Sequence, residues 1–394
     1  MSVSAGVLVV GASAAGLSTA EALRRKGYRG NIALLGAEPQ VPYDRPPLSK
    51  QILAGIWEPE RARLRSAEHL AELGVDLVLG DPAVALDVSA RTVYTESGRT
   101  LRGQAVVLAT GVRARTLPGP ALSGVHVLRT LDDATGLRAA LLAAERVVVV
   151  GEGVLGAEIS ATARALGLHV TMVGPQPAPM AAQLGRPVAD PLAELHTERG
   201  VALRLCAGVA EIAGARGHVT GVRLDTGEIV PADVVVVAIG GIPATDWLIG
   251  SGLHLDNGIV CDSHCRAAPN VYAAGDVARW RHERLSTSIR LENRTNATEQ
   301  AAAVADEILG AGKPYAPVPY FWSDQFDARI QVHGSIPSGA EAHIVDGSIA
   351  DRRFVARYRH AGRITGVVGW NMPKQVRMRR QELLGDQLAC AATE

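Results

Sequence analysis

Two glycine-rich turns have the residue types and the spacing that bind a dinucleotide. The first runs from Gly11 to Gly16 and the second from Gly151 to Gly156. In each case a short apolar run precedes the turn and a helical pattern follows it, so backbone N–H groups at the start of the helix point toward a pyrophosphate. Because the two turns lie in separate parts of the chain, the sequence predicts two nucleotide sites.

The two turns differ at their middle glycine. The second turn is complete, and its predicted nucleotide-binding residues are Gly151, Gly153, Val154, Leu155 and Gly156. In the first turn, Ser13 stands where the backbone approaches the pyrophosphate. Since serine adds only a small side chain and a hydroxyl donor, we expect the first turn to keep its ligand.

The elements that position these turns repeat in the same order. Each copy has a strand before the turn, a second strand after the helix, and a later apolar strand that ends in small residues. The predicted strands are 7–10, 32–35 and 105–108 in the first copy, and 147–150, 169–173 and 234–237 in the second. This repetition predicts an internal duplication of a mononucleotide-binding fold.

The predicted fold class is α/β, with two nested Rossmann-like dinucleotide-binding domains and a small C-terminal α+β domain that carries an antiparallel sheet. The proline-spaced segment 313–319 is the predicted linker to that last domain. Alternating segments beyond it, such as 328–332, indicate antiparallel strands. The predicted boundaries are 1–112 and 241–312 for the first domain, 113–240 for the second, and 317–394 for the third.

Composition excludes several classes of protein. The chain has 394 residues, with 40 basic side chains balanced by 40 acidic ones, which argues against a general nucleic-acid binder or a polybasic membrane protein. The first apolar run stops at Gly11, too short for a signal peptide or a membrane span. We therefore predict a cytoplasmic protein, monomeric or homodimeric, without a nucleic-acid partner.

The four cysteines, at 206, 261, 265 and 390, are too scattered for a disulfide framework.

Five further motifs occur in order along the chain. They are Tyr43 to Lys50, Ala109-Thr110-Gly111, Leu128 to Ala134, Ala274-Gly275-Asp276 and Phe321 to Gln325. Together they resemble the ferredoxin reductases that serve cytochrome P450 and ring-hydroxylating oxygenase systems, a branch of the FAD-containing pyridine-nucleotide oxidoreductases. The resemblance covers nearly the whole chain. It implies that the first fold holds FAD, that the second holds NADH or NADPH, and that the third domain covers the flavin on the side of the protein acceptor.

The resemblance also implies a set of cofactor contacts. For FAD these are Gly11, Ser13, Ala15, Gly16, Glu38, Arg45, Lys50, Thr110, Gly111, Arg129, Gly275, Asp276, Arg294 and Trp322. For NAD(P), Glu158, Gly174 and Gly240 join the second glycine turn. Glu38 is assigned to the FAD ribose because Ala37 stands where an acid is expected, and Asp276 has a second interpretation as a helix N-cap.

One segment departs from the family pattern. The family commonly places His and Trp against the flavin ring, where this chain has Asn293 and Arg294. A guanidinium at that place would stabilise an anionic reduced flavin.

Lys50 and Glu158 are the predicted catalytic residues. The resemblance implies that they pair beside the reactive flavin nitrogen, where a lysine donates a hydrogen bond and a carboxylate holds that lysine charged while bordering the nicotinamide. Without the resemblance, the same two residues are interpreted as a solvated lysine and a helix glutamate.

Nucleotide choice is open in the sequence. After the strand that ends at Val173, the chain has Gly174-Pro175-Gln176, without the acid that reads the ribose 2′-hydroxyl of NADH or an adjacent arginine for NADPH. Arg186, further along the chain, is a candidate for the missing arginine if it folds back toward Gly174. We therefore expect modest discrimination between NADH and NADPH, and a shift toward NADH in Gly174→Glu.

The acceptor is predicted from a missing motif. Relatives that reduce glutathione or lipoamide carry a Cys-x4-Cys pair after the second strand, whereas residues 38–60 contain no cysteine. A reduced flavin without a dithiol releases electrons singly, which suits a [2Fe–2S] ferredoxin. Two alternatives stay open: an NAD(P)H oxidase or quinone reductase, and a flavoprotein that changes partners with redox state. No metal site is predicted, because Cys261 and Cys265 fit small buried or surface residues better.

A run of basic residues near the C-terminus is the predicted docking surface for an acidic ferredoxin. Between residues 352 and 380 there is no Asp or Glu, and the basic residues are Arg352, Arg353, Arg357, Arg359, Arg363, Lys374, Arg377, Arg379 and Arg380. As a set they would steer an acidic partner toward the ring near Trp322. Taken singly, each is interpreted as a solvated side chain on a sheet or a basic tail.

Overall fold

The structure, a computed structural model, describes residues 2–391, and it describes side chains for residues 4–384. Cys390 therefore lies outside the residues whose side chains are described. The chain divides into two compact units, each discontinuous in sequence. Unit 1 comprises Met1–Asp44, Ala62–Arg113 and Ile242–Pro317, and unit 2 comprises Arg45–Arg61, Ala114–Gly241 and Val318–Glu394.

The main sheet of unit 1 has the strand order β18-β19-β6-β1-β2-β3. The bounds are β1 Ser2–Val10, β2 Ile32–Leu35, β3 Val75–Val78, β6 Thr100–Leu108, β18 Arg266–Ala268 and β19 Val271–Ala273. Neighbouring strands from β19 to β3 are parallel, while β18 is antiparallel to β19. Leu8 and Val9 in the central strand β1 are fully buried, because a parallel sheet is covered on both faces. This explains the uninterrupted apolar run in the sequence.

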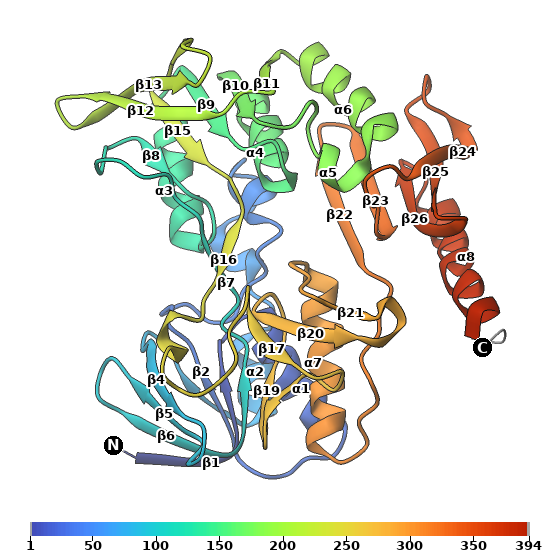
Figure 1. The fold of residues 1–394 in the computed structure, drawn as a ribbon. Coiled ribbons are helices and arrows are strands. Elements are labelled where there is room, and N and C mark those ends of the chain that lie inside the picture. Colours follow the sequence, from blue (N-terminus) through green and yellow to red (C-terminus); the bar gives the residue numbers. More distant parts are fainter. Residues whose placement is uncertain (1, 392–394) are drawn as a thin grey trace. The chain divides into compact units, whose positions relative to one another are not determined.

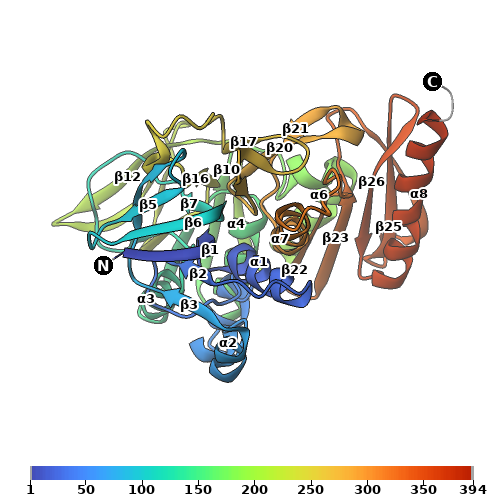
Figure 2. The ribbon, with the colours of Figure 1, turned by 90° about the horizontal axis from the view of Figure 1, so that it is seen from below.

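Helices and smaller sheets complete unit 1. Helices α1 (Ala14–Arg25) and α7 (Arg294–Ile308) lie side by side against the main sheet, as both views show (Figures 1 and 2). On α7, Ala297, Ala301 and Ala305 are buried at four-residue spacing, so one face of small residues allows this close packing. The remaining elements are α2 Ala67–Leu73, β4 Ala83–Asp87, β5 Thr92–Thr95, η3 Asp246–Leu248, β17 Ile259–Cys261, β20 Ala278–His282, η4 Glu283–Leu285 and β21 Thr287–Ile289.

Unit 2 contains the second Rossmann-like fold, with the parallel strand order β11-β10-β9-β15-β8. The strands are β8 Val125–His126, β9 Arg146–Val150, β10 His169–Gly174, β11 Val201–Leu205 and β15 Val234–Val237. The helices are η1 Leu48–Ile52, α3 Leu131–Leu142, α4 Val154–Ala165, α5 Ala181–Leu184 and α6 Arg186–Glu198. Unit 2 also contains the sheet of β12 Val209–Ala215, β13 His218–Leu224 and β14 Ile229–Pro231. The helix η2 Pro59–Ala62 and the strands β7 Val112–Ala114 and β16 Gly241–Pro243 span the points where the chain passes from one unit to the other.

The C-terminal part of unit 2 is an antiparallel sheet in the order β22-β23-β26-β25-β24. Its strands are β22 Tyr320–Gln325, β23 Ala328–Gly334, β24 Glu341–Ser348, β25 Arg353–His360 and β26 Arg363–Trp370. Helix α8 (Pro373–Ala391) lies along this sheet (Figure 2). Val376 and Leu383, seven residues apart on one face of α8, are buried with Val355 and Val367 of the sheet.

The predicted fold class is confirmed: parallel Rossmann-like sheets are joined by an antiparallel C-terminal sheet. The interpretation of the basic residues near the end of the chain as a tail is wrong, because residues 373–391 form α8. Among the described residues, no helix combines the length and the apolarity that crossing a membrane requires.

Candidate active site

The first glycine turn, in unit 1, needs glycine at both of its ends for steric reasons. Gly11 has φ +120°, and a Cβ there would lie 2.1 Å from the carbonyl oxygen of Ala109. A Cβ on Gly16 would lie 1.9 Å from the carbonyl oxygen of Gly11. Strand β6 and helix α1 therefore approach the turn so closely that no side chain fits.

The second turn, in unit 2, repeats this geometry. Gly151 has φ +117°, and a Cβ there would lie 2.3 Å from the carbonyl oxygen of Ala238. A Cβ on Gly156 would lie 1.9 Å from the carbonyl oxygen of Gly151. The duplication predicted from the sequence thus extends to the contacts of individual atoms.

The middle position of each turn is open rather than crowded. Ser13 is the N-cap of α1 with φ −130°, and Gly153 is the N-cap of α4 with φ −71°. A Cβ on Gly153 would meet nothing within 4 Å, and the Ser13 side chain makes no capping hydrogen bond. Neither position needs glycine for its backbone conformation, so Ser13 is accommodated. Both helix N-termini fit a pyrophosphate.

The other FAD candidates of unit 1 cluster at the carboxyl ends of its strands. Glu38 accepts a hydrogen bond from the Tyr43 hydroxyl. The Thr110 hydroxyl donates to the carbonyl of Ala244 at 3.0 Å, and the next residue, Gly111, has φ +69°.

Gly275 and Asp276 form the turn between β19 and β20. Gly275 has φ +79°, and its N–H donates to the Gln300 Oε1 atom at 2.8 Å. The interpretation of Asp276 as a helix N-cap is wrong, because strand β20 begins two residues later. The N-cap of α7 is Asn293, whose side-chain oxygen accepts from the N–H of Asn296 at 2.8 Å.

Arg294 carries less uncompensated charge than its sequence position suggests. Its Nε donates to the Asp44 carboxylate at 2.6 Å, and the two side chains form an ion pair within unit 1. The sequence-based expectation treated Arg294 as an unpaired positive charge beside the flavin. The Asp44 carboxylate offsets part of that charge.

Lys50 and Glu158 form an ion pair inside unit 2. The Lys50 Nζ lies 2.8 Å from the Glu158 Oε2, and the side chains are only 14% and 6% exposed. Lys50 comes from the short helix η1 and Glu158 from α4, and Thr162 ties these two helices by donating to the carbonyl of Ser49 at 2.7 Å. The alternative interpretation of Lys50 as a solvated surface lysine is therefore wrong.

Three donors surround the Glu158 carboxylate. Besides Lys50, the Ser49 hydroxyl donates to Oε2 at 2.6 Å and the Ser323 hydroxyl donates to Oε1 at 2.8 Å. Because all three donate to one carboxylate, its position and orientation are fixed. By contrast, the Lys50 Nζ bonds only Glu158 within the described part of the chain, which leaves two of its N–H groups for a ligand.

The polar network continues from Ser323 into the interior of unit 2. Gln325 donates to the Ser323 hydroxyl at 2.9 Å and accepts at Oε1 from the Nε2 atom of His196 at 2.8 Å. His196 is fully buried, and burial lowers its pKa, so the imidazole is neutral. Sequence reasoning included Ser49, Ser323 and Gln325 in family motifs without giving them a role, and it missed His196. The alternation of Ser323 and Gln325 on strand β22 was the available signal, because residues two apart face the same side.

Three more FAD candidates lie in unit 2. Arg45 donates from Nη1 to the carbonyl of Arg129 at 2.7 Å. The N–H of Arg129 donates to Asp133 at 3.0 Å, within the capping box that begins α3. Trp322 stacks on Tyr320 with ring centroids 6.1 Å apart. Of the NAD(P) candidates, Gly174 is the last residue of β10, and Gly240, with φ +94°, follows β15.

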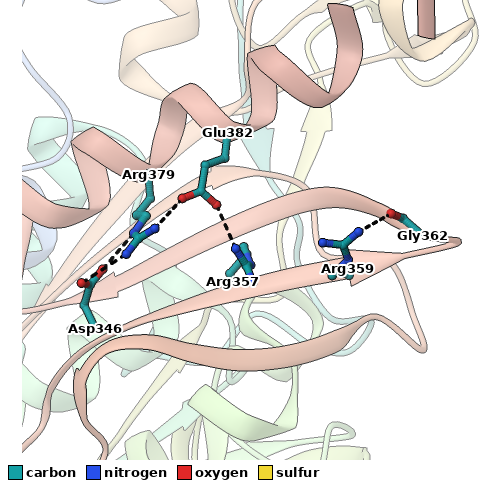
Figure 3. Close-up of polar contacts among 6 residues, drawn as sticks. All are labelled: Asp346, Arg357, Arg359, Gly362, Arg379 and Glu382. Atoms are coloured by element: carbon teal, nitrogen blue, oxygen red, sulfur yellow. Dashed lines mark hydrogen bonds and ion pairs between the residues drawn. The ribbon is translucent and has the colours of Figure 1, made fainter. Parts of the chain in front are cut away.

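Three arginines of the basic segment, Arg352, Arg357 and Arg379, pair with acids from outside it. Arg379 pairs with Asp346 at 3.0 Å and with Glu382 at 2.8 Å, and Arg357 lies 3.4 Å from the same Glu382. Figure 3 shows Arg379 between these two acids. Arg359 donates to the carbonyl of Gly362 (Figure 3). Arg352 pairs with Glu198 in a similar way. Arg377 and Arg380 are exposed and make no ion pair within the described residues.

The pH dependence of stability offers a test of this region. His333 is 8% exposed and stacks on Tyr320, and burial together with Arg380 and Arg377 lowers its pKa to about 4. The unfolded chain, with an ordinary histidine pKa of about 6.5, then binds a proton that the folded chain does not. The stabilisation is complete above pH 6.5 and is lost as the pH falls toward 4. We expect unfolding in urea to require about 2 kcal/mol less at pH 5 than at pH 7 from this residue, and His333→Phe to remove that difference. If the free energy of unfolding of His333→Phe changed between pH 5 and pH 7 as much as that of the wild type, this role of His333 would be contradicted.

The two described cysteines of unit 1 have the environment of packing residues. Cys261 and Cys265 are 5% and 0% exposed and are not disulfide-bonded. Burial raises the pKa of both thiols, that of Cys265 to about 12. Such thiols stay protonated and unreactive at neutral pH. The structure shows no grouping of three or more metal-ligating side chains within the residues that it describes.

Comparison with known proteins decides the family. Residues 5–301 match the pyridine nucleotide-disulphide oxidoreductase family, and residues 320–393 match the reductase C-terminal family. The chain belongs to the pyridine nucleotide-disulphide oxidoreductases. A curated relative of this oxidoreductase, rhodocoxin reductase from Rhodococcus erythropolis, is 37% identical over 93% of this chain and 87% of its own length.

Two solved structures have the same fold as this oxidoreductase. The ferredoxin reductase for the CYP199A2 system from Rhodopseudomonas palustris is 36% identical, with a TM-score of 0.90 over 93% of this chain and 91% of the other. The covalent putidaredoxin reductase–putidaredoxin complex is 33% identical, also with a TM-score of 0.90, over 96% and 92%. The predicted family, enzyme class and cofactors, FAD with NAD(P)H, are confirmed. The domain boundaries and the roles of individual site residues stay predictions.

Proposed function

We propose that this oxidoreductase takes a hydride from NADH or NADPH onto FAD and passes the electrons one at a time to a ferredoxin. The ferredoxin, of [2Fe–2S] or related type, would feed a cytochrome P450 or an oxygenase. The relatives named above support this acceptor, since they are reductases of such systems. A cytoplasmic location is part of the proposal.

The observation that carries the proposal is the largely buried Lys50 ammonium with two unused N–H groups. When bound, FAD supplies two-electron acceptance and one-electron release. The chain supplies the positioning: Glu158 pairs with Lys50, and Ser49 and Ser323 fix the Glu158 carboxylate. Lys50 would then be the group that hydrogen-bonds the flavin.

Binding is assigned to the two glycine turns. The N–H groups at the start of α1 would hold the FAD pyrophosphate, and those at the start of α4 would hold the pyrophosphate of the nicotinamide nucleotide. Residues 38–60 contain no cysteine pair that would accept both electrons together, which supports a one-electron acceptor over a disulfide substrate.

A comparison of acceptors tests the proposal. The purified protein is expected to be yellow, and NAD(P)H oxidation is expected to be faster with a [2Fe–2S] ferredoxin than with oxygen or a quinone. Failure to take up FAD on reconstitution would remove the proposal. Faster turnover with oxygen or a quinone would support the oxidase or quinone reductase alternative, and negligible turnover with every acceptor would support a redox-dependent interaction protein.

A further inference from the structure

The carboxylate of Glu152 lies at the end of strand β10, where the sequence shows no acid. Glu152 is the second residue of the second glycine turn and is 7% exposed. A Cβ built on Gly174 would lie 1.7 Å from the Glu152 Oε2 and 2.3 Å from its Cδ. The Glu152 side chain therefore occupies the place that a side chain at position 174 would take.

The first glycine turn shows that this proximity belongs to the fold. There, a Cβ on Gly36, the residue that follows β2, would lie 2.7 Å from the Cβ of Ala12. Ala12 and Glu152 hold the same position in their turns, and Gly36 and Gly174 hold the same position at the end of the second strand. A residue at the second position of such a turn thus faces the end of that strand, and only in the second turn does it carry a charge.

The hydrogen bonds of Glu152 leave one oxygen available. Its Oε1 accepts from the N–H of Gln176 at 3.2 Å, which fixes the orientation of the carboxylate. Its Oε2 accepts no hydrogen bond within the described part of the chain. The cation that the sequence offered for a 2′-phosphate, Arg186, instead pairs with Asp190 at 2.6 Å.

In dinucleotide-binding folds, an acid at the end of the second strand accepts hydrogen bonds from the adenosine ribose and disfavours a 2′-phosphate. We propose that Glu152 is this acid in the present chain, supplied by the glycine turn instead of the strand, and that it makes the enzyme selective for NADH. The inference rests on the proposed function, because it concerns the nucleotide that this function consumes. It also replaces the expectation of modest discrimination between NADH and NADPH. Gly174→Glu is no longer a suitable test of nucleotide choice, because the Glu152 side chain fills the space that a side chain at position 174 would need.

Binding of two nucleotide fragments to the FAD-loaded enzyme tests the inference without hydride transfer. In calorimetric titrations, ADP-ribose is expected to bind about 100-fold more tightly than 2′-phospho-ADP-ribose, since the phosphate meets a carboxylate of like charge. In Glu152→Gln, which keeps the shape of the side chain, this ratio should fall to about tenfold or less. The NADH-to-NADPH ratio of kcat/KM, measured with ferricyanide as acceptor, should fall in parallel.

A second variant perturbs the carboxylate without altering it. Gly174 does not have a left-handed φ, so Gly174→Ala is compatible with the backbone, and the added methyl group must displace the flexible end of Glu152. We expect Gly174→Ala to lower the preference for ADP-ribose over 2′-phospho-ADP-ribose. In the double variant with Glu152→Gln, the preference should fall no further than in Glu152→Gln alone. Glu211→Gln, an exposed carboxylate on β12, is the matched control and should leave the ratio unchanged.

The outcomes separate this inference from the proposed function. An unchanged ratio in both Glu152→Gln and Gly174→Ala, with ADP-ribose still bound, would overturn the role of Glu152 while leaving the function intact. A wild-type enzyme that binds 2′-phospho-ADP-ribose as tightly as ADP-ribose would do the same. Loss of ferredoxin reduction as such, with normal fragment selectivity, would instead count against the proposed function alone.

Discussion

Lys50→Ala is expected to slow flavin reduction by the preferred nucleotide about 10- to 100-fold, which corresponds to about 1.4 to 2.8 kcal/mol of lost stabilisation. The Lys50 Nζ is fixed 2.8 Å from Glu158 and presents its remaining N–H groups in a largely buried place. A charged donor in such a place interacts strongly with a reacting group. Stopped-flow measurement at saturating nucleotide isolates this step, and the dissociation constant of the nucleotide should change little.

The fold should tolerate this substitution. Glu158 keeps two donors, the hydroxyls of Ser49 and Ser323, so its carboxylate is not left buried without partners. The reverse deletion, Glu158→Ala, strands a lysine that is 14% exposed and is expected to lower stability more.

Lys26→Ala is the matched control, because Lys26 forms an exposed ion pair with Asp306 on α7 and exposed pairs contribute little. If flavin reduction and the flavin spectrum are the same in Lys50→Ala as in the wild type, Lys50 has only a structural role.

The two glycine turns were predictable because their requirement is local. Positive φ at Gly11 and Gly151, and the close approach of backbone atoms to Gly16 and Gly156, follow from a strand entering a helix within six residues. Any chain that makes this connection needs glycine at those positions, so the residue types reveal the fold without knowledge of distant contacts.

The surroundings of Glu158 depend on distant contacts. Ser49 is 109 residues away in the sequence and Ser323 is 165 away. No periodicity or spacing relates such positions, so only the family resemblance suggested the Lys50–Glu158 pair, and the two serines were quoted within motifs without a role. Glu152 was overlooked for a different reason: the prediction looked for the ribose acid along the strand, whereas the fold brings it from the turn.

The basic segment shows how charge counting along the chain misleads. No acid lies between residues 352 and 380, yet Asp346, Glu382 and Glu198 pair with its arginines from just outside or from α6 (Figure 3). Helix α8 was missed because its sequence is largely polar. Between residues 373 and 384, where side chains are described, Val376 and Leu383 are the buried apolar residues. Docking must therefore be tested at the arginines without acidic partners.

Charge reversal at Arg377 and Arg380 is expected to raise the KM for an acidic ferredoxin about tenfold. Both side chains are exposed on α8, and both help to lower the pKa of His333, which stacks on Tyr320 beside Trp322. Their charge therefore acts on the stacked rings of His333, Tyr320 and Trp322, where we expect the ferredoxin to dock. Arg379 should be left in place, because its reversal would break the pairs with Asp346 and Glu382 (Figure 3).

Salt and a small acceptor separate docking from chemistry in this variant. Steering is screened over a Debye length of about 10 Å at 0.1 M salt, so ferredoxin reduction by the wild type should slow as salt rises, and the variant should respond less. Ferricyanide reduction, which needs no docked protein, should be nearly unchanged. The control, Arg29→Glu with Arg102→Glu, makes the same change in net charge on exposed residues of unit 1. Equal effects of both double variants would indicate a general charge effect, and indifference to salt and to the Arg377 and Arg380 reversals would place the docking surface elsewhere.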